Sequence, residues 1–98
     1  MSPRLDIHES AELELNEAAD FYDLRSPGLG SAFLDEVERS LGHIAKHPEA
    51  AGPTLDVVRK RVLARFPYSI LYSVSDDRIR ILAIAHQKRR PFYWRGRR

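Results

Sequence analysis

The sequence predicts an α+β fold in which a helical hairpin packs on a small antiparallel sheet, in the order β-α-α-β-β-β. Two stretches with apolar residues at helical spacing fill the first half of the chain, and residues 26–28, Ser-Pro-Gly, separate them. Three runs with strand character follow in the second half, and the joints between them are short enough for hairpins. Because the helices must bury their apolar stripes, we expect them to cover one face of the resulting meander.

A short strand and the first helix open the chain. Residues 4–8 alternate polar and apolar side chains, which predicts a strand. We expect Ser10 to cap the following helix, which should run to Leu24 or Arg25. The dipole of this helix favours negative charge near its start, where three glutamates lie: Glu9, Glu12 and Glu14.

The second helix follows after a very short link, so the two helices should be antiparallel neighbours. Ser26 is its expected N-cap, with Pro27 in the first turn, where a missing N–H is harmless. Pro48 disfavours helical geometry in the residue before it, so the helix should end at or before His47. Its apolar face comprises Leu29, Phe33, Val37, Leu41 and Ile44.

Residues 48–56 are expected to form a loop, because two prolines and a glycine fall there. Strands are expected over residues 57–63, 68–75 and 79–85. The last of these runs is nearly all apolar, as is typical of a strand in the middle of a sheet.

The alternation in the middle strand predicts which side chains face the helices. The covered side comprises Ile70, Tyr72 and Val74, and the outward side comprises Ser69, Leu71 and Ser73. If His86 shares the outward face with Ser69, a shallow groove forms there, with the basic tail at its edge. A shift of one residue in register would reverse this assignment.

Composition excludes several classes of protein and site. The 98 residues should form a single domain, 1–98, that ends in a basic C-terminal tail, residues 87–98. The chain has no cysteine, which excludes disulfides and favours a cytoplasmic location. No apolar run approaches the roughly 20 residues needed to span a bilayer, so we expect no membrane segment. We expect no metal or cofactor, because the helical pair His43 and His47 lacks a carboxylate on the next turn.

Charge is distributed unevenly along the chain. Residues 1–56 hold four Lys/Arg and twelve Asp/Glu, a net charge of −8, whereas residues 57–98 hold twelve Lys/Arg and two Asp/Glu, a net charge of +10. This asymmetry predicts a face that meets an anionic partner. The alternative is that the acidic half neutralises the basic half within one fold.

The end of the last strand and the tail carry the side chains with the most chemistry. His86 is the best single candidate for a general acid or base, because an unperturbed histidine titrates near neutrality, unless a backbone carbonyl satisfies it. Tyr93 and Trp94 either stack on bases, with Tyr93 acting in proton transfer, or fold back on the core. Six cations are candidates for contacting phosphate or a target: Arg59, Arg61, Arg65, Lys88, Arg89 and Arg90.

Several segments in order resemble the RelE/ParE superfamily of bacterial type II toxin–antitoxin toxins. They are residues 18–22 (Ala-Ala-Asp-Phe-Tyr), 28–30 and 33–37, Pro48, 65–72 (Arg-Phe-Pro-Tyr-Ser-Ile-Leu-Tyr), 81–86, 89–91, and 93–94 (Tyr-Trp). The resemblance runs nearly from end to end. It implies a helical hairpin on a small antiparallel sheet, which agrees with the fold predicted above.

The resemblance also implies a growth-inhibiting toxin, neutralised by a cognate antitoxin that is a small DNA-binding protein. RelE-like members are ribosome-dependent endoribonucleases that cut messenger RNA without a metal, whereas ParE-like members poison DNA gyrase. Tyr93 matches the catalytic tyrosine of RelE-like toxins, and His86 lies near a catalytic histidine of some relatives. Ser69 and Gln87, however, stand where RelE-like toxins have arginines.

We therefore expect a ParE-like toxin, with Arg59, Arg61, Arg65, Lys88, Arg89, Arg90 and Trp94 as target contacts. A RelE-like nuclease that uses His86 and Tyr93 is the alternative, and a non-toxic relative that only binds the antitoxin is a third.

Overall fold

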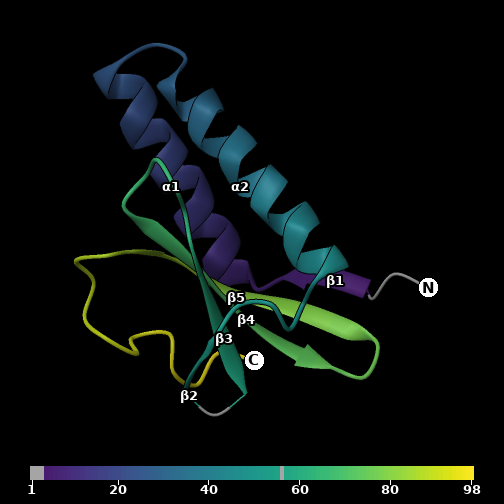
Figure 1. Ribbon diagram of the computed structural model, residues 1–98. Coiled ribbons are helices and arrows are strands. Elements are labelled where there is room, and N and C mark those ends of the chain that lie inside the picture. Colours follow the sequence, from purple (N-terminus) through teal and green to yellow (C-terminus); the bar gives the residue numbers. More distant parts are fainter. Residues whose placement is uncertain (1–3, 56) are drawn as a thin grey trace.

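A computed structural model describes residues 4–55 and 57–98 and contains two helices on one face of a five-stranded sheet (Figure 1). The elements are β1 (Arg4–Ile7), α1 (Glu9–Arg25), α2 (Leu29–Lys46), β2 (Pro53–Leu55), β3 (Val58–Val62), β4 (Tyr68–Ser75) and β5 (Arg78–His86). The strand order is β1-β5-β4-β3-β2. Strands β2 to β5 pair antiparallel, and β1 lies parallel to β5. The predicted helical hairpin on a meander is confirmed.

Strand β2 is an element that the sequence prediction missed, because it lies inside the expected loop 48–56. Pro53 pairs with Arg59, and Leu55 pairs with Val58. Pro53 is tolerated because β2 is the edge strand, where a missing backbone N–H removes no ladder bond. Asp56, also in the expected loop, lies outside the described residues.

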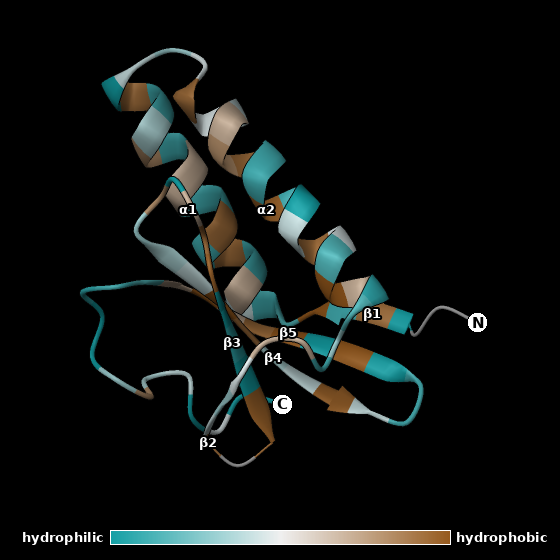
Figure 2. Cartoon of the chain, viewed as in Figure 1, coloured by the Kyte–Doolittle hydropathy of each residue, from teal (hydrophilic) through white to brown (hydrophobic). Residues whose placement is uncertain are grey.

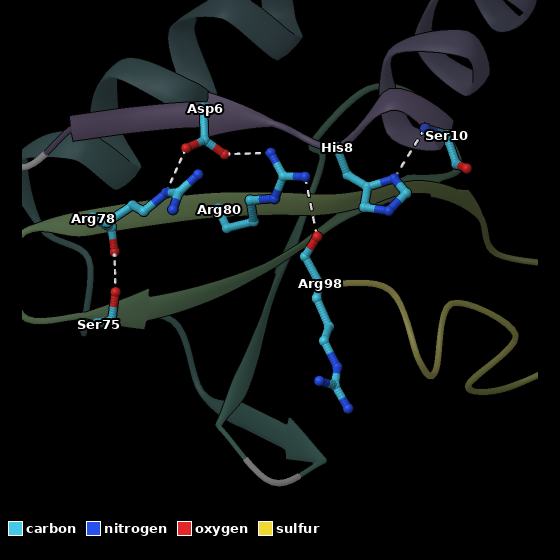
Figure 3. A network of polar contacts seen from close by, with 7 residues as sticks. All are labelled: Asp6, His8, Ser10, Ser75, Arg78, Arg80 and Arg98. Carbon is cyan, nitrogen blue, oxygen red and sulfur yellow. Dashed lines mark hydrogen bonds and ion pairs between the residues drawn. The ribbon is translucent and has the colours of Figure 1, made fainter.

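Both helix starts differ from the prediction. His8, not Ser10, is the N-cap of α1: its Nδ1 accepts a hydrogen bond from the Ser10 backbone N–H at 3.0 Å (Figure 3). Gly28, not Ser26, occupies the N-cap position of α2, and its φ is +89°. The chain reverses direction at this point through a left-handed residue, a conformation that glycine adopts without steric cost.

The helices approach each other closely at Gly30, in the first turn of α2. The backbone N–H of Gly30 donates to Asp23 Oδ1 at 2.8 Å, and a Cβ at position 30 would collide with the carbonyl oxygen of Ala19. A glycine at this position therefore lets the hairpin close.

The main core lies between the helices and the sheet. In Figure 2, which colours the ribbon by hydropathy, hydrophobic residues occur in both helices and in the strands beneath them. The largest fully buried side chains are Phe33, Val37, Ile44, Ile70, Tyr72, Ile79 and Ile81. The predicted covered face of β4 is therefore confirmed for Ile70 and Tyr72. The Tyr72 hydroxyl, buried in this core, donates to the carbonyl oxygen of Pro48 at 2.8 Å.

An extra residue in β5 changes which face its last residues occupy. Leu71 pairs with Ala83 but Tyr72 pairs with Ile81, so Leu82 has no partner of its own in β4. After this bulge His86 lies opposite Tyr68, on the helix side of the sheet. The expectation that His86 shares the outward face with Ser69 is wrong, because Ala85 takes that position.

The other face of the sheet is covered as well, contrary to the prediction of an open face. The C-terminal segment, residues 87–98, runs back beneath the sheet on the side away from the helices (Figure 1). Its Trp94 is buried in a second apolar cluster with Leu71 and Leu82. The segment is thus part of the fold rather than a free tail.

A network at the β1–β5 border fixes the end of the chain. Asp6 accepts hydrogen bonds from Arg80 and Arg78, both at 2.6 Å, and Arg80 also donates to the carbonyl oxygen of Arg98 at 3.0 Å (Figure 3). The hydrogen bond from Arg80, together with Arg78, outweighs the effect of burial and lowers the pKa of Asp6. Within the described part of the chain, neither helix combines the length and apolar character needed to cross a bilayer.

Candidate functional site

A cavity of about 300 Å³ separates the outer face of the sheet from the C-terminal segment. The sheet contributes Lys60, Ser69, Leu71 and Ala85, and the segment contributes Arg89, Arg90, Tyr93 and Trp94. His86 and Gln87 border the cavity where the strand ends. An apolar floor with cations on its rim suits a partner that is anionic, or one that is partly anionic and partly apolar. We refer to it as the C-terminal cavity.

Trp94 packs inward and exposes only 6% of its surface. It contacts the cluster that contains Val58 and Leu82, and the Phe92 ring meets it edge to face at 5.9 Å. Of the two interpretations given for this residue, the structure supports the one in which it folds back on the core. Trp94 therefore offers little surface to a target.

Tyr93 is held by a carboxylate from the other end of the chain. Its hydroxyl donates to Glu14 Oε2 at 2.7 Å, and the guanidinium of Arg89 lies 3.9 Å from the centre of its ring. Arg97 approaches the same ring at 5.1 Å. Burial, reinforced by the hydrogen bond to Glu14, raises the pKa of Tyr93 well above its ordinary value of 10. The phenol therefore stays protonated at neutral pH.

Glu14 holds Tyr93 beside the C-terminal cavity, and the sequence interpretation did not identify this role. It accepts hydrogen bonds from the Ile84 backbone N–H at 3.1 Å, from the Tyr93 hydroxyl, and from Arg97 at 2.9 and 3.2 Å. Strand β1 pairs with β5 only as far as Ile81, so the N–H of Ile84 needs another acceptor. The sequence marks Glu14 only as a helix-start glutamate, because its role depends on this register.

His86 is half-buried at the end of β5, with its ring against Tyr68 at a centroid distance of 5.0 Å. Its Nδ1 accepts a hydrogen bond from the backbone N–H of Lys88 at 3.0 Å. A neutral imidazole that accepts at Nδ1 carries its proton on Nε2 and can only donate there. A backbone group thus satisfies Nδ1 of the histidine, although the group is an amide and not the expected carbonyl.

The candidate cations divide between two separate regions. Lys88, Arg89 and Arg90 are exposed at the start of the C-terminal segment. Arg59 and Arg61 are on the other face of the sheet, because they pair with Tyr72 and Ile70 and share the helix side with them. These two groups do not form a single surface.

Arg59 in β3 and Arg65 in the turn after it have partners within the fold. Arg59 donates to the carbonyl oxygens of Ala51 at 2.6 Å and Glu49 at 3.2 Å, which fastens the 49–51 turn to β3. Arg65 forms an ion pair with Glu36 at 3.2 Å. These contacts favour a structural role for Arg59 and Arg65 over a role in binding a target.

Ion pairs inside the fold neutralise part of the uneven charge of the sequence. Four ion pairs among the described residues join a carboxylate of the acidic half to an arginine of the basic half. The carboxylates are Asp6, Glu14 and Glu36. Among the described residues, Lys88, Arg89, Arg90 and Arg95 have no ion-pair partner, so the C-terminal segment keeps a cationic surface.

Glu36 gives the protein an acid-sensitive contact. It is 7% exposed and accepts hydrogen bonds from the backbone N–H groups of Ala64 at 2.7 Å and Arg65 at 3.2 Å, as well as from the Arg65 guanidinium. Burial by itself would raise the pKa of Glu36. The hydrogen bonds outweigh it and hold the pKa below its ordinary value of 4.5.

This lowered pKa predicts how stability changes with pH. A carboxyl whose pKa is lower in the folded state stabilises the protein above pH 4.5, and the contribution is lost as the pH falls through the folded value. We expect Glu36→Gln to lower the free energy of unfolding at pH 7 by about 1–3 kcal/mol and to flatten the acid limb of its pH dependence. Urea denaturation over a pH series measures both quantities. Glu38→Gln, exposed on the same helix, is the control, and an unchanged acid limb for Glu36→Gln would contradict the assignment.

Comparison with known proteins gives consistent matches over most of the chain. Residues 5–91 match the family model described as ParE toxin of type II toxin-antitoxin system, parDE. The chain is 32% identical over 95 residues to Toxin ParE2 of Mycobacterium tuberculosis, in an alignment that covers 93% of this chain and 88% of the relative.

Two solved structures share the fold. The chromosomal ParDE toxin–antitoxin system from P. aeruginosa matches with a TM-score of 0.77 and 21% identity, over 87% of this chain and 96% of that one. The toxin–antitoxin complex RelBE2 from Mycobacterium tuberculosis matches with a TM-score of 0.60 and 18% identity, over 88% of this chain and 99% of that one.

Proposed function

This chain belongs to the ParE toxin family of type II toxin–antitoxin systems, and we propose that it arrests growth by binding DNA gyrase rather than by cutting messenger RNA. In this proposal the C-terminal cavity and its exposed cations form a contact surface and not a catalytic site. The observation that carries the proposal is the hydrogen bond from Tyr93 to Glu14.

The environment of Tyr93 argues against proton transfer. A general acid or base works best when its pKa lies near the operating pH. The pKa of Tyr93 is raised by burial and by Glu14, and its hydroxyl proton is already donated within the fold. A substrate would have to displace Glu14 before the phenol could act on it.

The arginine positions support the same conclusion. Ser69 and Gln87 stand where the RelE-like pattern has arginines, and Ser69 is buried beneath the C-terminal segment. Removing a charged group that stabilises a transition state costs on the order of 10²–10³ in rate. Arg59, Arg61 and Arg65 do not replace them, because they lie away from the C-terminal cavity.

A gyrase supercoiling assay with the purified protein tests the proposal. We expect inhibition once the protein is in molar excess over gyrase. The double substitution Arg89→Gln and Arg90→Gln should weaken inhibition, because it removes two exposed charges from the cavity rim. Normal supercoiling in the presence of excess folded protein would refute gyrase as the target.

His86→Ala distinguishes the contact surface from an active site. If His86 is only a strand-end histidine, the variant should arrest growth with less than about a twofold change in potency, since its main hydrogen bond is to a backbone amide. Growth of cells that induce the variant without an antitoxin is the measurement. Loss of arrest by a soluble, antitoxin-binding His86→Ala protein would favour an enzyme.

A RelE-like nuclease is the second candidate, and one observation favours it. His86, Tyr93, Lys60, Arg89 and Arg90 all border the C-terminal cavity, which brings proton-transfer groups and cations together. New codon-positioned cuts in messenger RNA from induced cells, mapped by primer extension, would support this activity. Unchanged growth on expression of the protein alone would instead indicate a non-toxic relative.

An antitoxin is the expected partner for either activity. The two structural relatives are a ParDE toxin–antitoxin system and the RelBE2 toxin–antitoxin complex. On this chain, α1 exposes Leu13, Phe21 and Leu24, with Leu24 89% exposed. We propose that a small DNA-binding antitoxin covers such apolar side chains with a segment that folds on binding, and that acidic residues in it meet the basic half of the chain. Co-purification with the product of the neighbouring open reading frame tests this partner.

A further inference from the structure

A second basic hollow, distinct from the C-terminal cavity, lies between α2 and the end of β3. Its volume is about 410 Å³. Arg39 and His43 line it from one face of α2, because they are four residues apart. Arg61 faces them from β3, and Arg65 closes the hollow from the following turn. We call it the α2–β3 pocket.

Arg61 presents an unsatisfied donor in this pocket. Its Nε is inaccessible to solvent and has no hydrogen-bond partner among the residues that the structure describes. Buried N–H groups are nearly always paired, and an orphaned donor on a charged group is costly. Because Arg61 lines the hollow, an acceptor that enters it can supply the missing partner once the side chain turns its Nε toward the hollow.

The charge of the pocket defines the kind of acceptor. It holds three guanidinium groups and one carboxylate, Glu36, which Arg65 and two backbone N–H groups already occupy. The remaining charge is about two positive units, from Arg39 and Arg61, and neither has an ion-pair partner among the described residues. The charge of Arg61 also acts on His43 and lowers the pKa of its imidazole, with burial contributing less.

We propose that the α2–β3 pocket binds a phosphate group, either free or as a phosphomonoester, through Arg61, Arg39 and His43. A phosphate group carries between one and two negative charges at neutral pH, which matches the unpaired charge of the pocket. It also has several acceptor oxygens, which suit guanidinium donors that approach from different elements. A carboxylate would neutralise only one of the two arginines. The proposal does not depend on which cellular target the protein inhibits.

Titration of the isotope-labelled protein with inorganic phosphate, followed by NMR, tests the proposal. We expect saturable shifts at the Arg61 Nε–Hε signal and at the His43 imidazole. Arg61→Gln should weaken binding about tenfold or more, because a charge-assisted hydrogen bond is lost. Arg39→Gln, an exposed position on α2 that should not disturb folding, is expected to weaken binding as well.

Lys60→Gln is the matched control, since it removes the same charge from the same strand but on the opposite face of the sheet. It should leave the affinity within about twofold of the wild type. A parallel titration with adenosine monophosphate shows whether the pocket prefers a phosphomonoester or free phosphate. Tighter binding of the nucleotide indicates a phosphomonoester and tighter binding of inorganic phosphate indicates the free ion, and both results support the pocket. Absence of saturable shifts, equal binding of acetate, or equal weakening by Lys60→Gln would overturn the proposal.

Discussion

Trp94→Ala is expected to lower the free energy of unfolding by about 3–5 kcal/mol, the usual cost of truncating a buried tryptophan. Trp94 is the large aromatic anchor between the C-terminal segment and the outer face of the sheet, where it packs with Leu71 and Leu82. Removing it leaves an apolar cavity at this contact. Urea denaturation followed by far-ultraviolet circular dichroism measures the loss without relying on tryptophan fluorescence.

Phe92→Ala provides a matched comparison for this experiment. Phe92 is an aromatic residue of the same segment, two positions away, but it is 43% exposed. Because burial determines the cost, this variant should lose clearly less stability than Trp94→Ala. Equal losses for the two variants would show that Trp94 is not the anchor of the segment.

The same contact affects the proposed function. If the C-terminal segment detaches from the sheet, Arg89 and Arg90 lose their fixed position beside the C-terminal cavity. A preorganised surface binds more tightly than a mobile one, so Trp94→Ala should also weaken growth arrest at temperatures where the variant remains folded.

The helical hairpin and the two faces of β4 followed from the sequence because periodicity is a local property. Phe33 and Val37 repeat at helical spacing, and Ile70 and Tyr72 alternate along a strand, so each pair indicates its own buried side. The position of β1 did not follow in the same way. Its parallel pairing with β5 joins residues more than 70 positions apart, and no local pattern specifies it.

The candidate site was less predictable than the fold, and β5 shows why. Both faces of this strand are apolar, since the helices cover one face and Trp94 covers the other. Alternation therefore carries no signal there, and the bulge at Leu82 that places His86 on the helix side is not visible in the sequence. The burial of Trp94 was foreseen only as one of two alternatives, because covering the outer face depends on the path of the whole C-terminal segment.

Glu14→Ala is expected to have an effect as large as that of Trp94→Ala, although Glu14 has no place in the apolar core. Its side chain is 14% exposed and pairs with Arg97, which is 19% exposed. Breaking a buried ion pair by removing one partner costs about 3–5 kcal/mol, because the other charge is left uncompensated. The substitution also removes the acceptor for the Ile84 N–H and the Tyr93 hydroxyl.

A double-mutant cycle with Arg97 tests whether this ion pair carries the effect. Arg97→Ala removes the charge that Glu14→Ala would otherwise leave buried, so the second substitution should cost less in the Arg97→Ala background. Glu12→Ala, exposed on the same helix, should change stability by no more than about 0.5 kcal/mol. Urea denaturation of the four proteins gives the coupling energy.

Hydrogen exchange adds a local measurement to the cycle. In Glu14→Ala the Ile84 amide should exchange faster, because its side-chain acceptor is gone, whereas the amide of Tyr72 in the adjacent strand should stay protected. Additive stability losses combined with an unchanged Ile84 amide would mean that Glu14 does not hold the C-terminal segment. In that case the Tyr93 hydroxyl would be free to take part in proton transfer, and the argument for a contact surface over a nuclease site would lose its main support.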